Sequence, residues 1–155
     1  MKVNHRVRGI ILTGPDRILV IKRIKPDRPH YYVTCGGGVE DGDATLEDAL
    51  KREIMEELGA RVRILRKVLV IDTQLSRNFM LREHFFVCRM IDQDLARRSG
   101  RELLDPDRGK YLPYRLSLRP ASFGRVDFRP TALRLFISEH ATRLTRLPDL
   151  RRKRK

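Results

Sequence analysis

The chain has 155 residues and a formal charge of +14, because 34 Lys and Arg outnumber 20 Asp and Glu. Hydrophobic residues make up 41% of the chain, which suffices for one packed core and argues against a disordered, collagen-like or disulfide-scaffold protein. The excess of cations indicates an anionic partner such as a nucleotide, a nucleic acid or an anionic membrane surface.

The N-terminal part predicts short strands separated by turns. Residues 3–12 mix basic and β-branched residues, residues 18–21 form an apolar run, and residues 31–34 are rich in β-formers. Two prolines within residues 25–29 predict a loop, and the glycines at 36–38 predict another.

Residues 46–58 predict an amphipathic helix. Thr45 stands three residues before Asp48, at the spacing of a helix cap, and Gly59 stands where helices commonly end. Apolar residues recur every four positions and predict a buried stripe, formed by Leu46, Leu50, Ile54 and Leu58.

The second half predicts more strands and a last helix. Residues 62–73 indicate a long strand or a strand pair, residues 82–90 a strand, and residues 112–118 an edge strand. Residues 92–110 are polar and predict a long loop, and residues 131–144 show helical spacing. Strands on both sides of a central helix predict a single mixed α/β domain.

The ends of the chain predict domain limits and location. We expect one domain over residues 1–147 and a solvated basic tail over residues 148–155, since residues 151–155 are all basic. Residues 1–20 contain no apolar run long enough for a signal peptide or a membrane span. With only two cysteines, Cys35 and Cys88, we expect reduced thiols and a cytoplasmic protein without a membrane partner.

Three glutamates on the predicted helix suggest a metal site. Glu53, Glu56 and Glu57 stand at i, i+3 and i+4, so they share one helical face at the border of the apolar stripe. Like charges at this spacing repel, and a divalent cation relieves the repulsion. Carboxylate oxygens suit Mg²⁺ or Mn²⁺. By itself, such a pattern is usually a solvated helix face.

The glycines at 36–38 add a second feature immediately before this helix. Glycine backbone amides approach an anion closely, and a helix N-terminus favours negative charge. A glycine run alone usually marks a loop. In combination with the carboxylates, it indicates metal-assisted attack on a phosphate or diphosphate.

Residues 37–60 resemble the sequence box of the Nudix hydrolases. The second half of the box, residues 52–60, reads Arg-Glu-Ile-Met-Glu-Glu-Leu-Gly-Ala and matches the family at every specified position. The first half departs, because the family spacing puts Ala44 where the family has Glu. We prefer an alignment with one inserted residue, which begins at Gly37 and places the carboxylate of Asp43 at that position.

The resemblance implies a Nudix-type α/β/α sandwich with a mixed β-sheet. It implies hydrolysis of a pyrophosphate linkage in a nucleoside diphosphate derivative or a nucleoside triphosphate. Glu53, Glu56 and Glu57 would hold Mg²⁺, with Mn²⁺ as an alternative, and Arg52 would orient them, which makes these four the expected catalytic set. Phosphate or substrate contacts are expected from Gly36, Gly37, Gly38 and Glu40.

A second acid often comes from a distant loop in this family. Glu83, Glu102, Asp105 and Asp107 are candidates, and we favour Glu102 because the 92–110 segment can reach the cleft.

Two other functions stay open at this point. The basic tail favours a hydrolase that acts on RNA 5′ ends and contacts RNA through that tail. The altered first half of the box and the high charge favour a non-catalytic nucleotide- or RNA-binding module on a Nudix scaffold. The resemblance also allows a homodimer, since Nudix proteins are often dimers.

Overall fold

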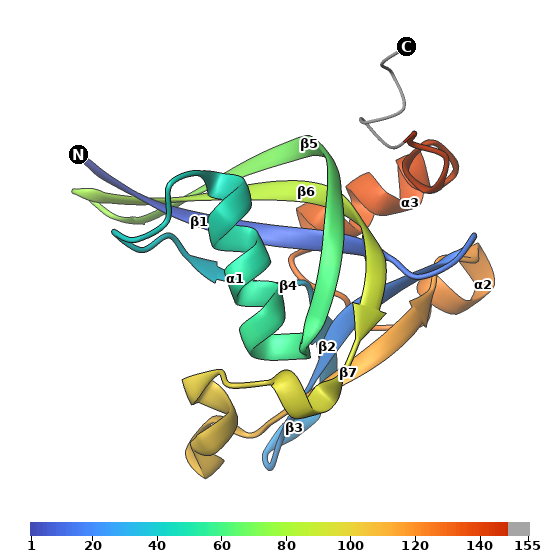
Figure 1. The fold of residues 1–155 in the computed structure, drawn as a ribbon, viewed down its shortest axis with the longest axis horizontal. Coiled ribbons are helices and arrows are strands. Elements are labelled where there is room, and N and C mark those ends of the chain that lie inside the picture. The colour runs from blue at the N-terminus through green and yellow to red at the C-terminus, as the bar shows by residue number, and fades with distance from the viewer. Residues whose placement is uncertain (149–155) are drawn as a thin grey trace.

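The computed structural model describes residues 1–148, which form a seven-stranded mixed sheet with helices on both faces (Figure 1). The predicted tail therefore lies almost entirely outside the described residues. The strands are β1 Lys2–Leu12, β2 Arg17–Lys25, β3 Arg28–Val33, β4 Cys35–Gly38, β5 Ala60–Ser76, β6 Phe79–Gln93 and β7 Lys110–Ser117.

The sheet is organised around β1. Its strand order is β3-β2-β1-β6-β5, and β1 runs parallel to β6 from the pair Lys2 and Phe79 to the pair Leu12 and Arg89. The other pairings are antiparallel, with β4 beside β1 and β7 beside β2. Within the described residues, β7 has no second strand neighbour, which confirms the predicted edge strand.

Alternation along the central strands builds two cores, one on each face of the sheet. One core contains Leu12, Val20 and Val87, and it packs against helix α3 (Thr131–Thr145). The other core contains Ile11 and Leu19, and it packs against helix α1 (Leu46–Leu58). These two residues directly precede Leu12 and Val20 in the sequence, so neighbouring side chains point to opposite faces. The predicted α/β/α sandwich is thus confirmed (Figure 1).

Helix α1 has the predicted bounds and caps. The hydroxyl of Thr45 accepts a hydrogen bond of 3.0 Å from the amide of Asp48. Gly59 ends the helix at φ 63°, in the left-handed region where a side chain is strained. Leu50, Ile54 and Leu58 are fully buried, as the apolar stripe predicts.

Removing the helix cap gives a direct test of this local structure. Thr45→Ala is expected to lower the free energy of unfolding by about 1 kcal/mol, because the Asp48 amide loses its acceptor. Urea denaturation measures the change, and Thr45→Ser, which keeps the hydroxyl, is the control. Equal stability of the two variants would show that the cap contributes nothing here.

Three loop predictions need correction. Residues 36–38 are strand rather than loop, because Gly36 lies so close to β1 that a Cβ would overlap the carbonyl oxygen of Val7. The 25–29 loop is a shorter turn, with Pro29 already in β3. The 92–110 segment is not irregular throughout: it holds three 3₁₀ turns, η1 Leu95–Arg97, η2 Arg101–Leu104 and η3 Pro106–Arg108.

Two further properties bear on the sequence predictions. Cys35 and Cys88 are both free and buried, which confirms the expected thiols. Among the described residues, no helix is long and apolar enough to cross a membrane. A short helix, α2 Pro120–Phe123, completes the fold.

Candidate functional site

The box glutamates lie where α1 meets β4. Glu53 and Glu57 are buried, each about 8% exposed, whereas Glu56 is half-buried. The helix places them at the border of its apolar stripe, as their spacing predicts. Gly37 leaves room for Glu53: a Cβ on Gly37 would lie 2.5 Å from the carboxyl carbon of that glutamate. The glycine run therefore lets β4 pass directly over a carboxylate.

Glu57 is held from the side of β4. Its Oε1 accepts a hydrogen bond of 3.1 Å from the amide of Gly36 and lies 3.1 Å from Sγ of Cys35. Burial raises the pKa of Glu57 to about 8, with contributions in the same direction from a hydrogen bond with Glu102 and from the charge of Glu53. The amide of Gly36, which the sequence suggested as a phosphate ligand, thus already binds a glutamate.

Arg52 connects the glutamates to the turn before the helix. Its guanidinium donates to Glu53 at 3.1 Å, to Glu56 at 3.4 Å and to the carbonyl of Gly38 at 3.0 Å. It also lies 3.3 Å from the exposed carboxylate of Glu40. Such charge-assisted bonds fix both the arginine and its carboxylate partners.

Asp43 is the main partner of Arg52. Its two oxygens take hydrogen bonds of 3.0 and 2.8 Å from the guanidinium, and Oδ2 also accepts the amide of Glu40 at 2.8 Å. These hydrogen bonds lower the pKa of Asp43 to about 2, and the bonds from Arg52 make the largest contribution. The structure places Asp43, and not Ala44, against the arginine, as in the alignment with one inserted residue.

A cavity of about 380 Å³ opens beside the buried glutamates. The three predicted glycines line it, as do Glu53, Glu57 and Glu102, whereas Glu40 and Glu56 do not. Its other charged walls are four arginines from three separate segments: Arg6, Arg8, Arg23 and Arg108. Carboxylates and cations thus face one space, which suits an anionic ligand that also binds a metal ion.

The arginine wall was missed by the sequence analysis. One signal was available, since Arg6 and Arg8 alternate within a predicted strand and must share a face. Arg23 and Arg108 carry no such signal, because they are far apart in the sequence and come together only in the folded protein. There, Arg23 donates to the carbonyl of Arg108, and its guanidinium stacks 3.7 Å from the ring centroid of Tyr111.

The remaining acidic candidates lie elsewhere. Glu83 forms an ion pair of 2.9 Å with Arg8, and Asp105 accepts the amide of Asp107. Asp105 and Asp107 do not line the cavity. Of the four acids considered for the second-acid position, Glu102 is the one that the fold brings to the box glutamates.

The donor chemistry of the cavity suits a divalent cation. Burial raises the pKa of both Glu53 and Glu57, so their negative charge is poorly compensated by the protein alone. Hard carboxylate oxygens are the ligands that Mg²⁺ and Mn²⁺ prefer. Within residues 1–148, no three acidic, histidine or cysteine side chains already converge as a complete metal site.

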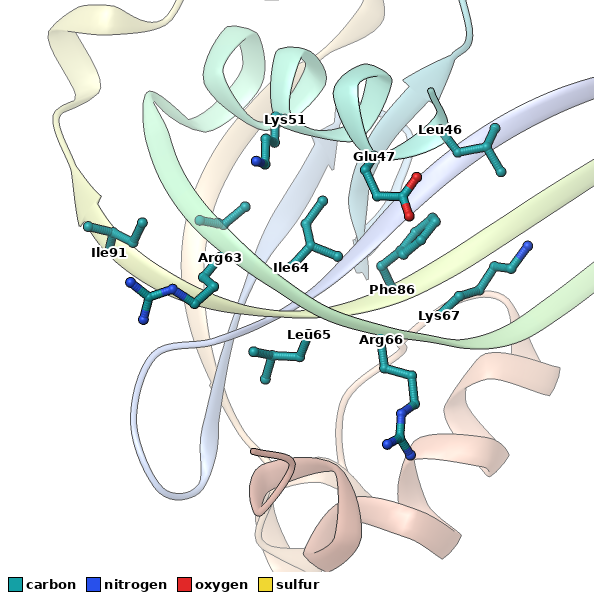
Figure 2. Close-up of a pocket in the computed structure, with 11 residues that line it drawn as sticks. Leu46, Glu47, Lys51, Arg63, Ile64, Leu65, Arg66, Lys67, Phe86 and Ile91 are labelled. Atoms are coloured by element: carbon teal, nitrogen blue, oxygen red, sulfur yellow. The ribbon is translucent and has the colours of Figure 1, made fainter. Parts of the chain in front are cut away.

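A larger hollow of about 640 Å³ lies on another side of α1, between the helix and β5. Figure 2 shows Glu47 and Lys51 extending from the helix toward that strand, while Arg66 extends away from the helix. None of the three box glutamates lines this hollow. Its acidic residue, Glu47, therefore serves as a control position rather than a candidate ligand.

Comparison with known proteins agrees with this geometry. The model of the NUDIX domain matches residues 3–115 of the chain. The chain belongs to the Nudix family. That family uses divalent metal ions and acts on small nucleotide substrates.

Individual relatives extend the comparison. The nucleoside triphosphatase NudI of Escherichia fergusonii is 41% identical over 68 residues, which cover 41% of this chain and 47% of NudI. The matched part thus spans about half the length of that curated relative.

Solved structures confirm the fold. A NUDIX hydrolase from Nitrosomonas europaea superposes with a TM-score of 0.68 at 19% identity, covering 95% of this chain and 93% of its own. A MutT NUDIX hydrolase from Burkholderia pseudomallei gives 0.54 at 21% identity, with 94% and 96% covered.

The raised pKa of Glu57 predicts how stability depends on pH in the metal-free Nudix domain. The carboxyl group titrates near 4.5 when unfolded and near 8 when folded, so the folded state binds the extra proton between these values. The free energy of unfolding is therefore expected to fall as pH rises from 4.5 to 8. Urea denaturation in EDTA measures this slope. Glu57→Gln should flatten it, and an unchanged slope would contradict the assignment.

Proposed function

We propose that this chain is a Mg²⁺-dependent hydrolase that cleaves a pyrophosphate linkage in a nucleoside triphosphate or a nucleoside diphosphate derivative. The observation that carries the proposal is the cavity in which Glu53, Glu57 and Glu102 face four arginines. A pyrophosphate chain needs both a metal platform for its oxygens and cations for its remaining charge. The partial match to a protein named nucleoside triphosphatase supports a triphosphate substrate.

Each residue of the site has a defined role in this proposal. Glu53, Glu56 and Glu57 would hold Mg²⁺, or Mn²⁺ in its place, and the bound ion would neutralise phosphate charge and favour ionisation of water. Arg52 keeps the glutamates oriented, and Gly37 and Gly38 leave space for the phosphates. Glu40 contributes through its contact with Arg52 rather than through the substrate.

Glu102 is the proposed general base. It accepts a proton from water while the water oxygen attacks phosphorus, and the bond between that phosphorus and the bridging oxygen breaks. The leaving phosphate takes up the electron pair, and the arginine wall stabilises its charge.

A hydrolysis screen tests the proposal. Purified protein is incubated with Mg²⁺ and with nucleoside triphosphates, including oxidised ones, nucleotide sugars, dinucleotides and triphosphorylated or capped RNA. Chromatography identifies the products and hence the phosphate that is attacked. Metal-dependent turnover of a nucleotide supports the proposal, and binding without turnover of any substrate would favour a non-catalytic module.

RNA 5′ ends are a second candidate substrate, favoured by the five basic residues at 151–155. In this reading, residues 1–147 are a single catalytic domain and residues 148–155 add electrostatic contacts to RNA. Deleting residues 151–155 would then weaken RNA processing most strongly at low salt, since salt screens such contacts. The same deletion should leave turnover of free nucleotides unchanged.

A further inference from the structure

The C-terminal turn of α1 is capped by the end of β6 and the segment that follows it. The carbonyl of Glu56 accepts hydrogen bonds of 2.9 Å from the amides of both Ser99 and Gly100. The carbonyl of Leu58 accepts a bond of 3.1 Å from the side chain of Gln93. Helix termini leave such carbonyls without partners inside the helix. The end of the glutamate helix therefore depends on residues about forty positions later in the chain.

Arg98 makes the most extensive of these contacts. Its Nε donates to the carbonyl of Glu57 at 2.6 Å, and its Nη2 donates to the carbonyl of Tyr111 at 2.7 Å. One planar guanidinium thus joins the end of α1 to the edge strand β7. The last turn of α1 has no basic residue of its own, so Arg98 also supplies the cation that a helix C-terminus favours.

Glu102 follows this anchor by four residues. It lines the same cavity as Glu57, and its side chain contributes to the raised pKa of that glutamate. Arg98 itself does not line that cavity. The position of the Glu102 carboxylate therefore depends on a short stretch of chain whose start is fastened to the backbone of Glu57.

We propose that Arg98 is a positioning residue, which locks the 98–102 segment onto the end of α1 and so holds Glu102 beside Glu57. The inference rests on the proposed function, because Glu102 acts there as the base. The role belongs to the guanidinium fork, since a lysine cannot donate to both carbonyls from one planar group.

Kinetics of Arg98→Ala, Glu102→Ala and the double variant test this role. Arg98→Ala is expected to lower kcat by about 10- to 100-fold, as is typical for residues that orient a catalytic group, with little change in KM. In the Glu102→Ala background the same substitution should cost less than about twofold, because residues that act through one another are not additive. Guanidinium ion added to Arg98→Ala should restore part of kcat.

Arg97→Ala is the matched control. Arg97 is the preceding residue, pairs with Asp92 at 2.7 Å and does not line the cavity, so its removal should leave kcat unchanged. An equal loss in Arg97→Ala, or a full loss from Arg98→Ala in the Glu102→Ala background, would overturn the proposal. Arg98→Lys should behave like Arg98→Ala, and full activity of the lysine variant would also overturn it.

Hydrogen exchange supplies a readout that does not depend on turnover. The amides of Ser99 and Gly100 are expected to exchange faster in Arg98→Ala, and unchanged exchange would contradict the anchoring. If the parent protein hydrolyses nothing, the proposed function fails while exchange still decides whether Arg98 anchors the segment.

Gly100→Ala moves Glu102 while leaving Arg98 in place. A Cβ on Gly100 would lie 2.6 Å from Oε1 of Glu102, so that side chain must shift. Its backbone lies at φ −61°, which alanine readily adopts. This variant should keep the parent's stability and lose kcat as Arg98→Ala does, whereas parental kcat would overturn the link between segment position and catalysis.

Discussion

Glu57→Gln is expected to lower kcat by about 100- to 1,000-fold, the range seen when one charged or polar group that stabilises a transition state is removed. Glutamine keeps the shape and can still accept from the amide of Gly36, but it cannot provide an anionic metal ligand. A steady-state assay on the substrate found in the screen measures the loss. Titration with Mn²⁺, followed by magnetic resonance of the free ion, should show weaker metal binding in parallel.

Glu47→Gln is the control for this experiment. Glu47 lies on the same helix but lines the hollow of Figure 2 and not the candidate active site. Its removal changes the net charge by the same amount and should leave both kcat and Mn²⁺ affinity unaltered. If both variants lost kcat and Mn²⁺ affinity to a similar degree, the effect of Glu57→Gln would come from the change in net charge and not from the loss of a metal ligand.

Asp43→Ala is expected to lower kcat by about 10- to 100-fold, because Asp43 holds the guanidinium that contacts the glutamates proposed as metal ligands. Arg52→Lys should cause a similar loss, since lysine keeps the charge but cannot make the bidentate contact. The double variant should be little worse than either single one. Steady-state kinetics at saturating Mg²⁺ measure all three.

Asp41→Ala provides the comparison within the same turn. Asp41 is exposed, and its removal should leave kcat at the parental value. Full activity of Asp43→Ala would show that the other partners of Arg52 suffice to hold it. The carboxylate that the shifted alignment places at position 43 would then have no role in catalysis.

The helix of the site could be predicted almost residue by residue because its signals are local. Thr45, the four-residue apolar period and Gly59 fix the start, buried face and end of α1 within fifteen positions. The Asp43 alignment also followed from local spacing. These features depend on neighbours in sequence, so one sequence contains them.

The cavity could not be predicted in the same way, because non-local contacts build its other wall. Arg23 and Arg108 meet through strand pairing between β2 and β7 and through the 3₁₀ turns. The glycines at 36–38 were misread as a loop, since their strand is defined by the close approach of Val7 and not by β-forming side chains. Glu102 was favoured for its reach and does line the cavity, whereas Arg98 had no sequence signal.

The capping of α1 by residues 93–100 has a consequence for the order in which a growing polypeptide completes its site. During synthesis the box is finished by residue 60, yet its helix end gains its partners only after Gly100 has emerged, and Arg98 gains its second acceptor only with Tyr111. Contacts this distant in sequence form late, because the intervening chain must first be ordered. A nascent chain should therefore carry all three box glutamates for some time before it can hydrolyse anything.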